Sequence, residues 1–287
     1  MSAPLVTVVT PSYNQAAYLE DAIESVLAQD YPRIEYAVAD GGSADGSVEI
    51  LKRYEDRLAW WTSGPDGGQS AALNTAFARA QGEILGWLNS DDTLLPGAVS
   101  RVVAELERDP ELALVYGDAE FVDEAGAPMF TLHARPFDKD VMVRACANHV
   151  VQPGSLFRRS AWRPFDEAAY YFFDFQFVLG LEERQVRRLD GPPLATYRVH
   201  AGSKSVGEPL RKARDYARLA SVLPPAGRRA AWLGAGEYFY DALELGPARR
   251  ALLRARPTST RGLGLLAKTW LPRAVVAAAK RRRAARD

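Results

Sequence analysis

Four strand-like segments alternate with four helix-like segments in the first half of the chain, and this alternation constrains the fold more than any other feature. The strand-like segments are mostly apolar and read "PLVTVVTPSYN", "IEYAVAD", "RLAWWTS" and "EILGWLN". Each is followed by a segment with helical spacing of apolar residues, such as Leu19, Ile23 and Val26 in "QAAYLEDAIESVLAQ". Strands that alternate with helices predict an α/β fold, with a mostly parallel sheet covered by helices on both faces.

The segments that leave the four predicted strands share one composition. They read "TPSYN", "ADGGSADGS", "SGPDGG" and "NSDD", and they are rich in Gly, Ser, Asn and Asp. In open parallel sheets, ligands bind beyond the carboxyl ends of the strands. The sequence therefore predicts a polar binding site at this edge. The segment "GPDGG" lacks the Lys of a phosphate-binding P-loop, so we expect it to be a turn before the next helix.

Two adjacent carboxylates, Asp91 and Asp92, follow the fourth predicted strand. Like charges at the end of a buried strand repel each other, so we expect a cation nearby. Carboxylate oxygens, with Asn89 as a neutral oxygen donor, suit a hard divalent cation such as Mg²⁺ or Mn²⁺. The alternative is that these acids only cap the next helix and interact with its dipole.

Several motifs occur in an order and spacing that resembles family 2 of the glycosyltransferases. They are "VTVVTPSYNQAAYLEDAIESVLAQDYP", "ADGGSADGS", "GQSAALNTAFARAQGEILGWLNSDDTLLPGAV", "DFQFVLGLEE" and "YRVHAGSKS". The resemblance covers residues 4 to about 206. It implies the GT-A fold, a Rossmann-like sheet that binds a nucleoside-diphosphate-sugar donor.

The resemblance implies a donor site at the strand exits. Tyr13 would lie against the nucleotide base, and Asp40 would be the acidic residue of the base and ribose site. Gly41 stands where many relatives carry a second acid, which leaves the base identity open. The other matched donor positions are Pro11, Asn14, Asn74, Asn89 and Ser90.

The resemblance also implies a metal site. Asp91 matches the last acid of the family's Asp-x-Asp metal motif, whose first acid is replaced here by Asn89. Asp92 would support Asp91, and His200 would meet the metal or a phosphate, although its Gly/Ser context also fits a plain surface position. With one carboxylate fewer, we expect binding of Mn²⁺ or Mg²⁺ that is weak or depends on phosphate.

Asp174 in "YYFFDFQFVLGLEE" matches the family's catalytic base. Four aromatic residues precede it, so burial is expected to raise its pKa. The alternative is that Asp174 is an ordinary helix N-cap. Gln176 stands where relatives often have a second acid.

Other polar and aromatic residues near these motifs are expected to be structural. His149 and Gln152 precede an expected strand, and Arg158 and Arg159 are either a phosphate clamp or solvated edge charges. Tryptophans within strands pack in the core more often than they stack on sugars. The four considered are Trp60, Trp61, Trp87 and Trp162.

Composition favours a cytoplasmic protein. The one cysteine, Cys146, excludes an intramolecular disulfide framework. The N-terminus lacks the basic segment and long apolar core of a signal peptide, and no apolar run reaches the roughly 20 residues that span a bilayer. We therefore expect a cytoplasmic location, with peripheral attachment to the inner face of the membrane as the alternative.

Charge divides the chain into an acidic body and a basic tail, which we predict as domains 1–210 and 211–287. The body holds 18 Lys and Arg against 31 Asp and Glu, and the tail holds 18 against 5. Within the tail, "AAWLGAGEYFYDALELGPARRALLRARP" resembles one tetratricopeptide-like helix pair, which must pack on another surface. The basic stretch "LPRAVVAAAKRRRAARD" would bind anionic lipid, a protein partner or the acidic body. The acidic body argues against nucleic-acid binding.

The function predicted from these residues is inverting transfer of a sugar to a hydroxyl of a glycan or lipid-linked acceptor, in the assembly of surface polysaccharide, glycolipid or glycoconjugate. A sugar-nucleotide nucleotidyltransferase is the enzymatic alternative, but "TPSYNQAAY" shows no basic, Gly-rich triphosphate loop. A non-catalytic binding or assembly subunit is the other alternative, and the departures at Gly41, Asn89 and Gln176 keep it open.

Overall fold

The chain forms two compact units. The computed structural model describes residues 3–204, 208–242, 244–257, 259–269, 276–277 and 280. Unit 1 comprises Met1–Asp138, Asn148–Ala169 and Phe173–Val206, and unit 2 comprises Lys139–Ala147, Tyr170–Phe172 and Gly207–Asp287. Two short segments inside the predicted first domain thus pack with unit 2. The domain boundary at residue 210 stays a prediction, because compactness does not show which part folds alone.

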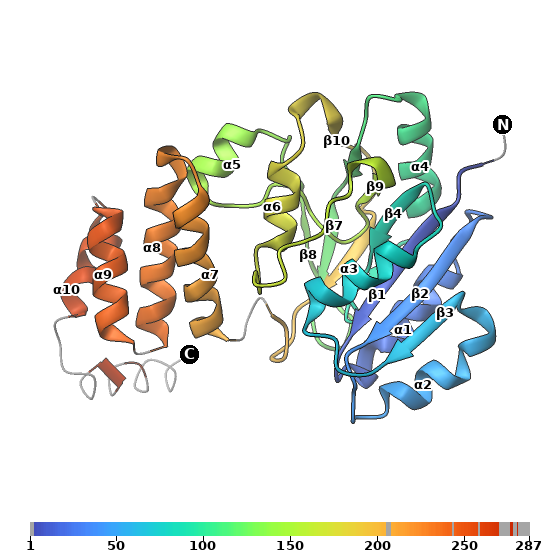
Figure 1. Ribbon diagram of the computed structural model, residues 1–287, viewed down its shortest axis with the longest axis horizontal. Coiled ribbons are helices and arrows are strands. Elements are labelled where there is room, and N and C mark those ends of the chain that lie inside the picture. The colour runs from blue at the N-terminus through green and yellow to red at the C-terminus, as the bar shows by residue number, and fades with distance from the viewer. Residues whose placement is uncertain are drawn as a thin grey trace. The chain divides into compact units, whose positions relative to one another are not determined.

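Unit 1 is built on a seven-stranded sheet with the order β10-β6-β9-β4-β1-β2-β3 (Figure 1). Neighbouring strands run parallel except at β9, which is antiparallel to both β4 and β6. The mixed but mostly parallel α/β architecture that was predicted is therefore confirmed. The strands are β1 (Val6–Ser12), β2 (Ile34–Asp40), β3 (Trp60–Ser63), β4 (Ile84–Trp87), β6 (Leu114–Tyr116), β9 (Leu156–Arg158) and β10 (Val186–Arg188).

Helices cover both faces of this sheet, because the side chains of its central strands are buried on both sides, as in β1 and β4. On one face, α1 (Ala16–Leu27), α2 (Ser47–Arg53) and α4 (Ala98–Arg108) share a core cluster with β1, β2 and β4. On the other face, α3 (Gln69–Arg79) and α6 (Phe173–Leu179) bring aromatic rings against Trp87 and Phe157. Short 3₁₀ turns complete the unit, namely η1 (Glu55–Arg57), η2 (Arg159–Ala161) and η3 (Glu183–Gln185).

A second, four-stranded sheet of unit 1 was not predicted from the sequence. Its order is β5-β11-β7-β8, and the strands are β5 (Thr93–Leu94), β7 (Ala119–Val122), β8 (Pro128–Leu132) and β11 (Ala195–Arg198). Strand β11 pairs antiparallel with β5, with Thr196 opposite Thr93. This pairing carries the residues that follow β11 to the exit of β4, which is the edge where the site was predicted.

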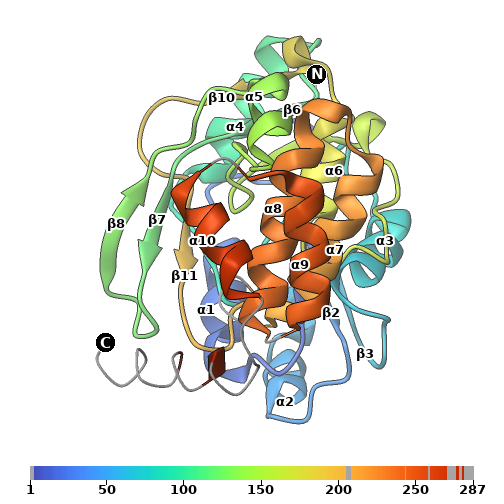
Figure 2. The same cartoon turned by 90° about the vertical axis from the view of Figure 1, so that its left-hand side faces the viewer.

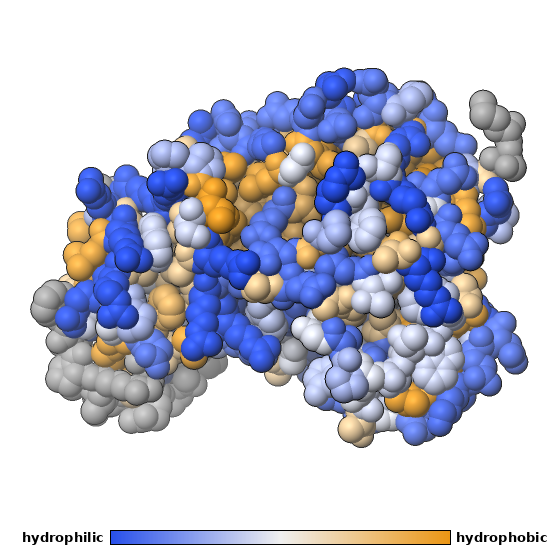
Figure 3. Space-filling view, viewed as in Figure 1, coloured by the Kyte–Doolittle hydropathy of each residue, from blue (hydrophilic) through white to orange (hydrophobic). Residues whose placement is uncertain are grey.

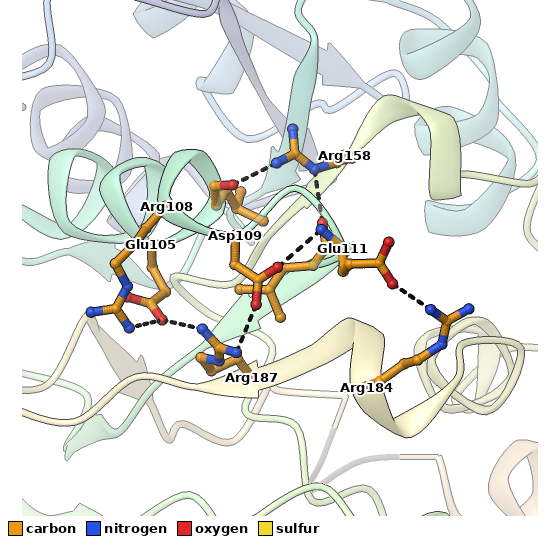
Figure 4. Close-up of polar contacts among 9 residues, drawn as sticks. Glu105, Arg108, Asp109, Glu111, Arg158, Arg184 and Arg187 are labelled. Carbon is orange, nitrogen blue, oxygen red and sulfur yellow. Dashed lines mark hydrogen bonds and ion pairs between the residues drawn. The ribbon is translucent and has the colours of Figure 1, made fainter.

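The opposite edge of the seven-stranded sheet is held by arginines (Figure 4). Arg187 of β10 bridges Glu105 and Asp109, with N···O distances of 2.8 Å to each. Arg158 donates to the carbonyl oxygens of Leu106 and Leu112, at the end of α4 and beyond it. Arg159 likewise donates to the carbonyls of Gly82 and Ala80, just after α3. Both arginines predicted as a clamp or as edge charges therefore cap the chain where helices end.

Unit 2 is helical. It contains α5 (Lys139–Ala145), α7 (Pro209–Val222), α8 (Pro225–Asp241), α9 (Leu245–Ala255) and α10 (Thr260–Lys268). The predicted helix pair corresponds to α8 and α9, and α8 packs against α5, α7 and α9, as Figure 2 shows for the last two. A Cβ atom on Gly234 would lie 2.6 Å from the Tyr216 ring, so this glycine allows α7 and α8 to approach closely.

The predicted basic stretch at residues 271–287 lies outside the described residues, apart from residues 276–277 and 280. Among these, Lys280 forms an ion pair with Asp241 at 2.8 Å. The lipid, partner and acidic-body alternatives for this stretch stay predictions. In the part of the chain that the structure describes, no helix combines the length and apolar character needed to cross a membrane.

Candidate functional site

The exits of β1 to β4 meet at one edge of the seven-stranded sheet. The parallel register places Ser12 beside Asp40 and Asp40 beside Ser63, and Val9 beside Trp87. The strands thus end together, and the polar segments that follow them are neighbours (Figure 1). The hydroxyl of Ser12 is buried and has no hydrogen-bond partner among the described residues. Ser12 was not among the predicted site residues, although it lies between the predicted donor residues Pro11 and Tyr13.

Asp40 organises the loop that follows β2. It is 2% exposed, and its carboxylate accepts hydrogen bonds from the backbone N–H groups of Gly42 and Ser43 at 3.1 and 2.9 Å. The hydroxyls of Ser43 and Ser63 donate to it at 2.5 and 2.6 Å. Four donors on one carboxylate fix the loop conformation, so the observed role of Asp40 is to shape this part of the site.

Asn14 joins the exit of β1 to the same loop. It adopts a left-handed backbone conformation with φ of 52°, which Asn tolerates better than most residues. Its N–H donates to the Ser43 hydroxyl at 2.7 Å, and its Oδ1 accepts from the N–H of Ala44 at 3.0 Å. Pro11 remains within β1, so Asn14 is the residue that turns the chain across the sheet edge.

Tyr13 is the most exposed aromatic side chain at this edge, at 63%. A Cβ atom on Gly41 would lie 3.3 Å from Cδ2 of Tyr13 and 3.1 Å from Oδ2 of Asp66. A larger residue at position 41 would therefore crowd both side chains. The acid that many relatives carry at this position is absent, but Asp66 from the predicted turn "GPDGG" brings a carboxylate to the same place. Sequence analysis missed Asp66 because its segment was read only as a turn.

The two adjacent acids after β4 have different surroundings. Asp92 is 2% exposed; its Oδ1 accepts from the N–H of Arg198 at 2.9 Å, and its Oδ2 accepts from Nδ2 of Asn89 at 3.0 Å. Burial raises the pKa of Asp92 well above its ordinary value, and the charge of Asp91 adds to the rise. Asp91 is more exposed, and its Oδ2 lies 3.1 Å from Nε2 of His200. Asp92 thus connects β11 to the segment that follows β4, whereas Asp91 faces the site.

Arg198 braces this arrangement. Its side chain is 7% exposed and donates to the carbonyl oxygens of Asp91 and Glu124, each at 3.0 Å, and to Oδ2 of Asp21 at 3.1 Å. The guanidinium stacks 5.0 Å from the centre of the Tyr18 ring, which itself contacts the His200 ring. Arg198 lies in the motif "YRVHAGSKS", but Asp91, which accepts a hydrogen bond from its side chain, is 107 residues away.

We expect Arg198→Met to destabilise unit 1 by about 2–4 kcal/mol, because two carbonyl oxygens and one carboxylate lose a donor while the apolar stem is kept. The measurement is the free energy of unfolding in denaturant. Arg184→Met is the control, since the ion pairs of Arg184 are exposed and its loss should leave the midpoint almost unchanged. Equal stability of the two variants would contradict the bracing role.

Asp174 lies in the first turn of α6. The residue keeps some exposed surface, whereas its carboxyl group is enclosed. Its Oδ1 accepts from the N–H of Phe175 at 2.7 Å, and its Oδ2 accepts from Nδ2 of Asn148 at 3.1 Å. Burial raises the pKa of Asp174, and these hydrogen bonds and the charge of Lys204 oppose the rise. A carboxylate of this kind is a stronger base than an exposed one.

Two of the remaining predicted donor residues, Asn74 and Asn89, form hydrogen bonds within unit 1. Asn74 of α3 binds the backbone of Phe165 through both amide atoms, at 2.7 and 3.0 Å, and so fixes the segment that leads to α6. Asn89 donates to Oε1 of Gln152 at 3.2 Å, and Gln152 donates to the carbonyl of Trp87 at 2.8 Å. Ser90 is buried. The structural role expected of Gln152 stays a prediction.

Among the tryptophans, Trp87 is 5% exposed and packs against Phe77, which fits the expected core position. Trp60 and Trp61 are only partly buried, and the guanidinium of Arg79 stacks 4.5 Å from the Trp60 ring. Trp162 contacts the Phe77 ring and is also partly buried.

The donor set at Asp91 suits a hard divalent cation. One carboxylate oxygen and one imidazole nitrogen lie 3.1 Å apart at a strand exit. The carboxylate suits Mn²⁺ or Mg²⁺, and histidine nitrogen is a common metal ligand in proteins. Within the described ranges, no three His, Cys, Asp or Glu side chains gather into a ready-made cage. Since the Asp92 carboxylate is occupied by the backbone and by Asn89, phosphate oxygens would have to complete the coordination.

A cavity of about 390 Å³ in unit 1 is lined by residues of α6 and of the segment that follows β9. Strand β9 runs antiparallel to β4, so Ser160 and Ala161 after it lie toward the edge opposite the strand exits. Gln176, at the position where relatives often have an acid, faces this cavity. Apolar surface gathers around α6 in Figure 3. The cavity thus lies beside the helix that carries Asp174.

Residues 7–163 match the family model described as glycosyl transferase family 2. An uncharacterized glycosyltransferase of Rickettsia felis is 36% identical over 129 residues, which are 44% of this chain and 21% of that protein. The chain thus spans about a fifth of the length of this relative.

Two solved structures share the fold. The Staphylococcus aureus protein TarS, solved with UDP-GlcNAc, has a TM-score of 0.62 at 15% identity, over 91% of this chain and 84% of that one. A mannosyltransferase from Pyrobaculum calidifontis, solved with GDP-Man and Mn²⁺, has a TM-score of 0.53 at 21% identity, over 92% of this chain and 79% of that one. The neighbours are GT-A glycosyltransferases, and the predicted GT-A fold is confirmed.

Proposed function

The chain belongs to glycosyl transferase family 2, and from this membership and the strand-exit site we propose that it transfers a sugar from a nucleoside-diphosphate sugar to an acceptor hydroxyl, with inversion. One observation carries the proposal. The pair formed by Asp91 and His200 and the enclosed carboxyl group of Asp174 lie in the same unit, and the charge of Lys204, four residues after His200, lowers the pKa of Asp174.

Asp174 is the proposed catalytic base. It would take the proton from the acceptor hydroxyl while the oxygen of that hydroxyl attacks the anomeric carbon. The bond from this carbon to the diphosphate breaks on the opposite face, so the configuration inverts. Because burial raises the pKa of Asp174, its basicity is greater than that of an exposed carboxylate.

The nucleotide part of the donor would lie against the exits of β1, β2 and β3. The exposed ring of Tyr13 offers a face on which a base can stack. Asp40 and Asn14 shape the loop beside it, and the carboxylate of Asp66 is the acid nearest to Gly41. Pro11, Ser12, Asn74, Asn89 and Ser90 complete the proposed donor site.

Asp91 and His200 are the proposed ligands of Mn²⁺ or Mg²⁺, with Asp92 supporting Asp91 from behind. A divalent ion there would neutralise charge on the departing diphosphate. A single carboxylate facing the site fits weak binding of the metal before the nucleotide arrives. The Mn²⁺ in the related mannosyltransferase structure supports this proposal.

Calorimetric titration of the full chain with UDP, GDP and dTDP, each with and without Mn²⁺, tests the donor site. We expect one nucleotide to bind in the micromolar range and Mn²⁺ to strengthen its binding tenfold or more. Mn²⁺ alone should bind weakly, and tight binding to the nucleotide-free protein would contradict the proposed coordination. If no nucleotide binds under any condition, the non-catalytic alternative becomes the better reading.

The acceptor is proposed only as a class: a glycan or lipid-linked hydroxyl, used in building surface polysaccharide, glycolipid or glycoconjugate. Attachment of the basic tail to the inner face of the membrane is part of the same proposal. The nucleotidyltransferase alternative is disfavoured because the segment after β1 carries no basic residue before Glu20.

A further inference from the structure

A lysine that sequence analysis did not select lies within the candidate site. The ammonium of Lys204 donates to Oε1 of Gln69 at 2.7 Å. It also lies 6.0 Å from the centre of the Phe173 ring, and its positive charge lowers the pKa of Asp174. Lys204 therefore lies between Gln69, at the start of α3, and Phe173, the residue before Asp174 on α6.

A directed chain of amide groups connects Lys204 to the metal motif. Because the oxygen of Gln69 accepts from Lys204, its Nε2 is turned to Oδ1 of Asn89, at 2.8 Å. The Nδ2 of Asn89 then donates to Oδ2 of Asp92 at 3.0 Å. An aspartate at position 89 would lack this donor and would place a third carboxylate beside two others. Asn89 thus suits a site in which the ammonium of Lys204 lies nearby and position 89 carries no carboxylate.

A tight turn carries both His200 and Lys204 to the sheet edge. The N–H of Ser203 donates to the carbonyl of His200 at 3.0 Å, and the N–H of His200 donates to Oγ of Ser203 at 3.1 Å. Ser203 is 3% exposed, so the turn is anchored in the unit. His200 then faces Asp91, while Lys204 faces Gln69 at the start of α3.

We propose that Lys204 binds the β-phosphate of the donor and shares with the metal at Asp91 and His200 the negative charge that develops on the leaving diphosphate. This inference rests on the proposed function. As the sugar–phosphate bond breaks, its electron pair stays on the diphosphate, and the acceptor proton goes to Asp174. Lys204 stabilises the diphosphate by a charge-assisted hydrogen bond and transfers no proton. Gln69 and Asn89 hold the ammonium in position.

The test compares the full-length wild type with Lys204→Met, Lys204→Gln and Lys204→Arg. Calorimetry measures binding of UDP and GDP, and of UMP and GMP, which lack the β-phosphate, in EDTA and in Mn²⁺. In EDTA, Lys204→Met and Lys204→Gln should bind the better diphosphate at least tenfold more weakly, and the monophosphate within about twofold of wild type. Lys204→Arg should retain most of the affinity, and Mn²⁺ should reduce the defect.

The outcomes separate the alternatives. A glutamine at this position can still bond to Gln69, so the Lys204→Gln variant keeps the test valid if Lys204→Met fails to fold. Unchanged diphosphate binding in Lys204→Gln overturns the inference, and so does an equal loss for diphosphate and monophosphate, which indicates a purely structural role. Absence of nucleotide binding by the wild type is a failure of the proposed function itself.

Discussion

Replacing Asp174 with asparagine should lower kcat by about a thousandfold, while the affinity for the nucleotide stays within a factor of about three. The carboxamide keeps the size of the side chain but cannot accept the proton of the acceptor hydroxyl. The measurement is steady-state transfer kinetics with the donor identified by calorimetry. Asp215→Asn is the matched control, because burial also raises the pKa of Asp215, which belongs to unit 2.

The pH dependence gives this prediction a second readout. A base acts only when ionised, so kcat should fall tenfold for each pH unit below the pKa of Asp174. Because burial raises that pKa, the fall should begin at a higher pH than for an exposed aspartate. The residual activity of Asp174→Asn should lack this acid limb. A kcat close to that of wild type in this variant would exclude Asp174 as the base.

Asp91→Asn should lower kcat/KM by about a thousandfold or more and abolish the effect of Mn²⁺ on nucleotide affinity. The substitution preserves the shape of the side chain and a hydrogen bond to His200, but removes the carboxylate that faces the site. Calorimetry with and without Mn²⁺ and transfer kinetics are the measurements. Thermal unfolding should show little change, because Asp91 is not buried in the core.

The neighbouring Asp92→Asn is the control for this experiment. Both Asp92 oxygens accept hydrogen bonds, and an amide can satisfy only one of them, so this variant should lose stability but keep the effect of Mn²⁺. If instead Mn²⁺ acts normally on Asp91→Asn and not on Asp92→Asn, the roles proposed for the two acids are reversed.

The four repeating strand–helix units were predictable because their signals are local. Helix α1 presents Leu19, Ile23 and Val26 on one face, and β1 is buried along its whole length. The edge at which the strand exits meet was predictable because parallel strands end on the same side of a sheet. Asp40 and Asp91 were selected within those exits from the family resemblance, and their roles stay predictions.

The features that were not predicted depend on contacts between segments that are far apart in the sequence. Strand β9 has three residues, and β5 has two, which is too short for any periodic pattern. Lys204 donates a hydrogen bond to Gln69, which is 135 residues away, and Arg198 donates one to Asp91, which is 107 residues away. No local sequence pattern identifies such residues, because the topology of the two sheets determines which distant segments become their neighbours.

The antiparallel strand β9 has a consequence for how the chain is made. It fills the gap between β4 and β6, and both of these strands are synthesised before it. Until residue 158 has left the ribosome, β4 and β6 each present an unpaired edge, and the contacts that join Asp91 to Arg198 and His200 cannot yet form. Nascent chains with open strand edges are prone to aggregate. The pairing of β4 and β6 with β9 thus forms only after residue 158 has been made. The site residues are all present only when nearly three quarters of the polypeptide has been synthesised.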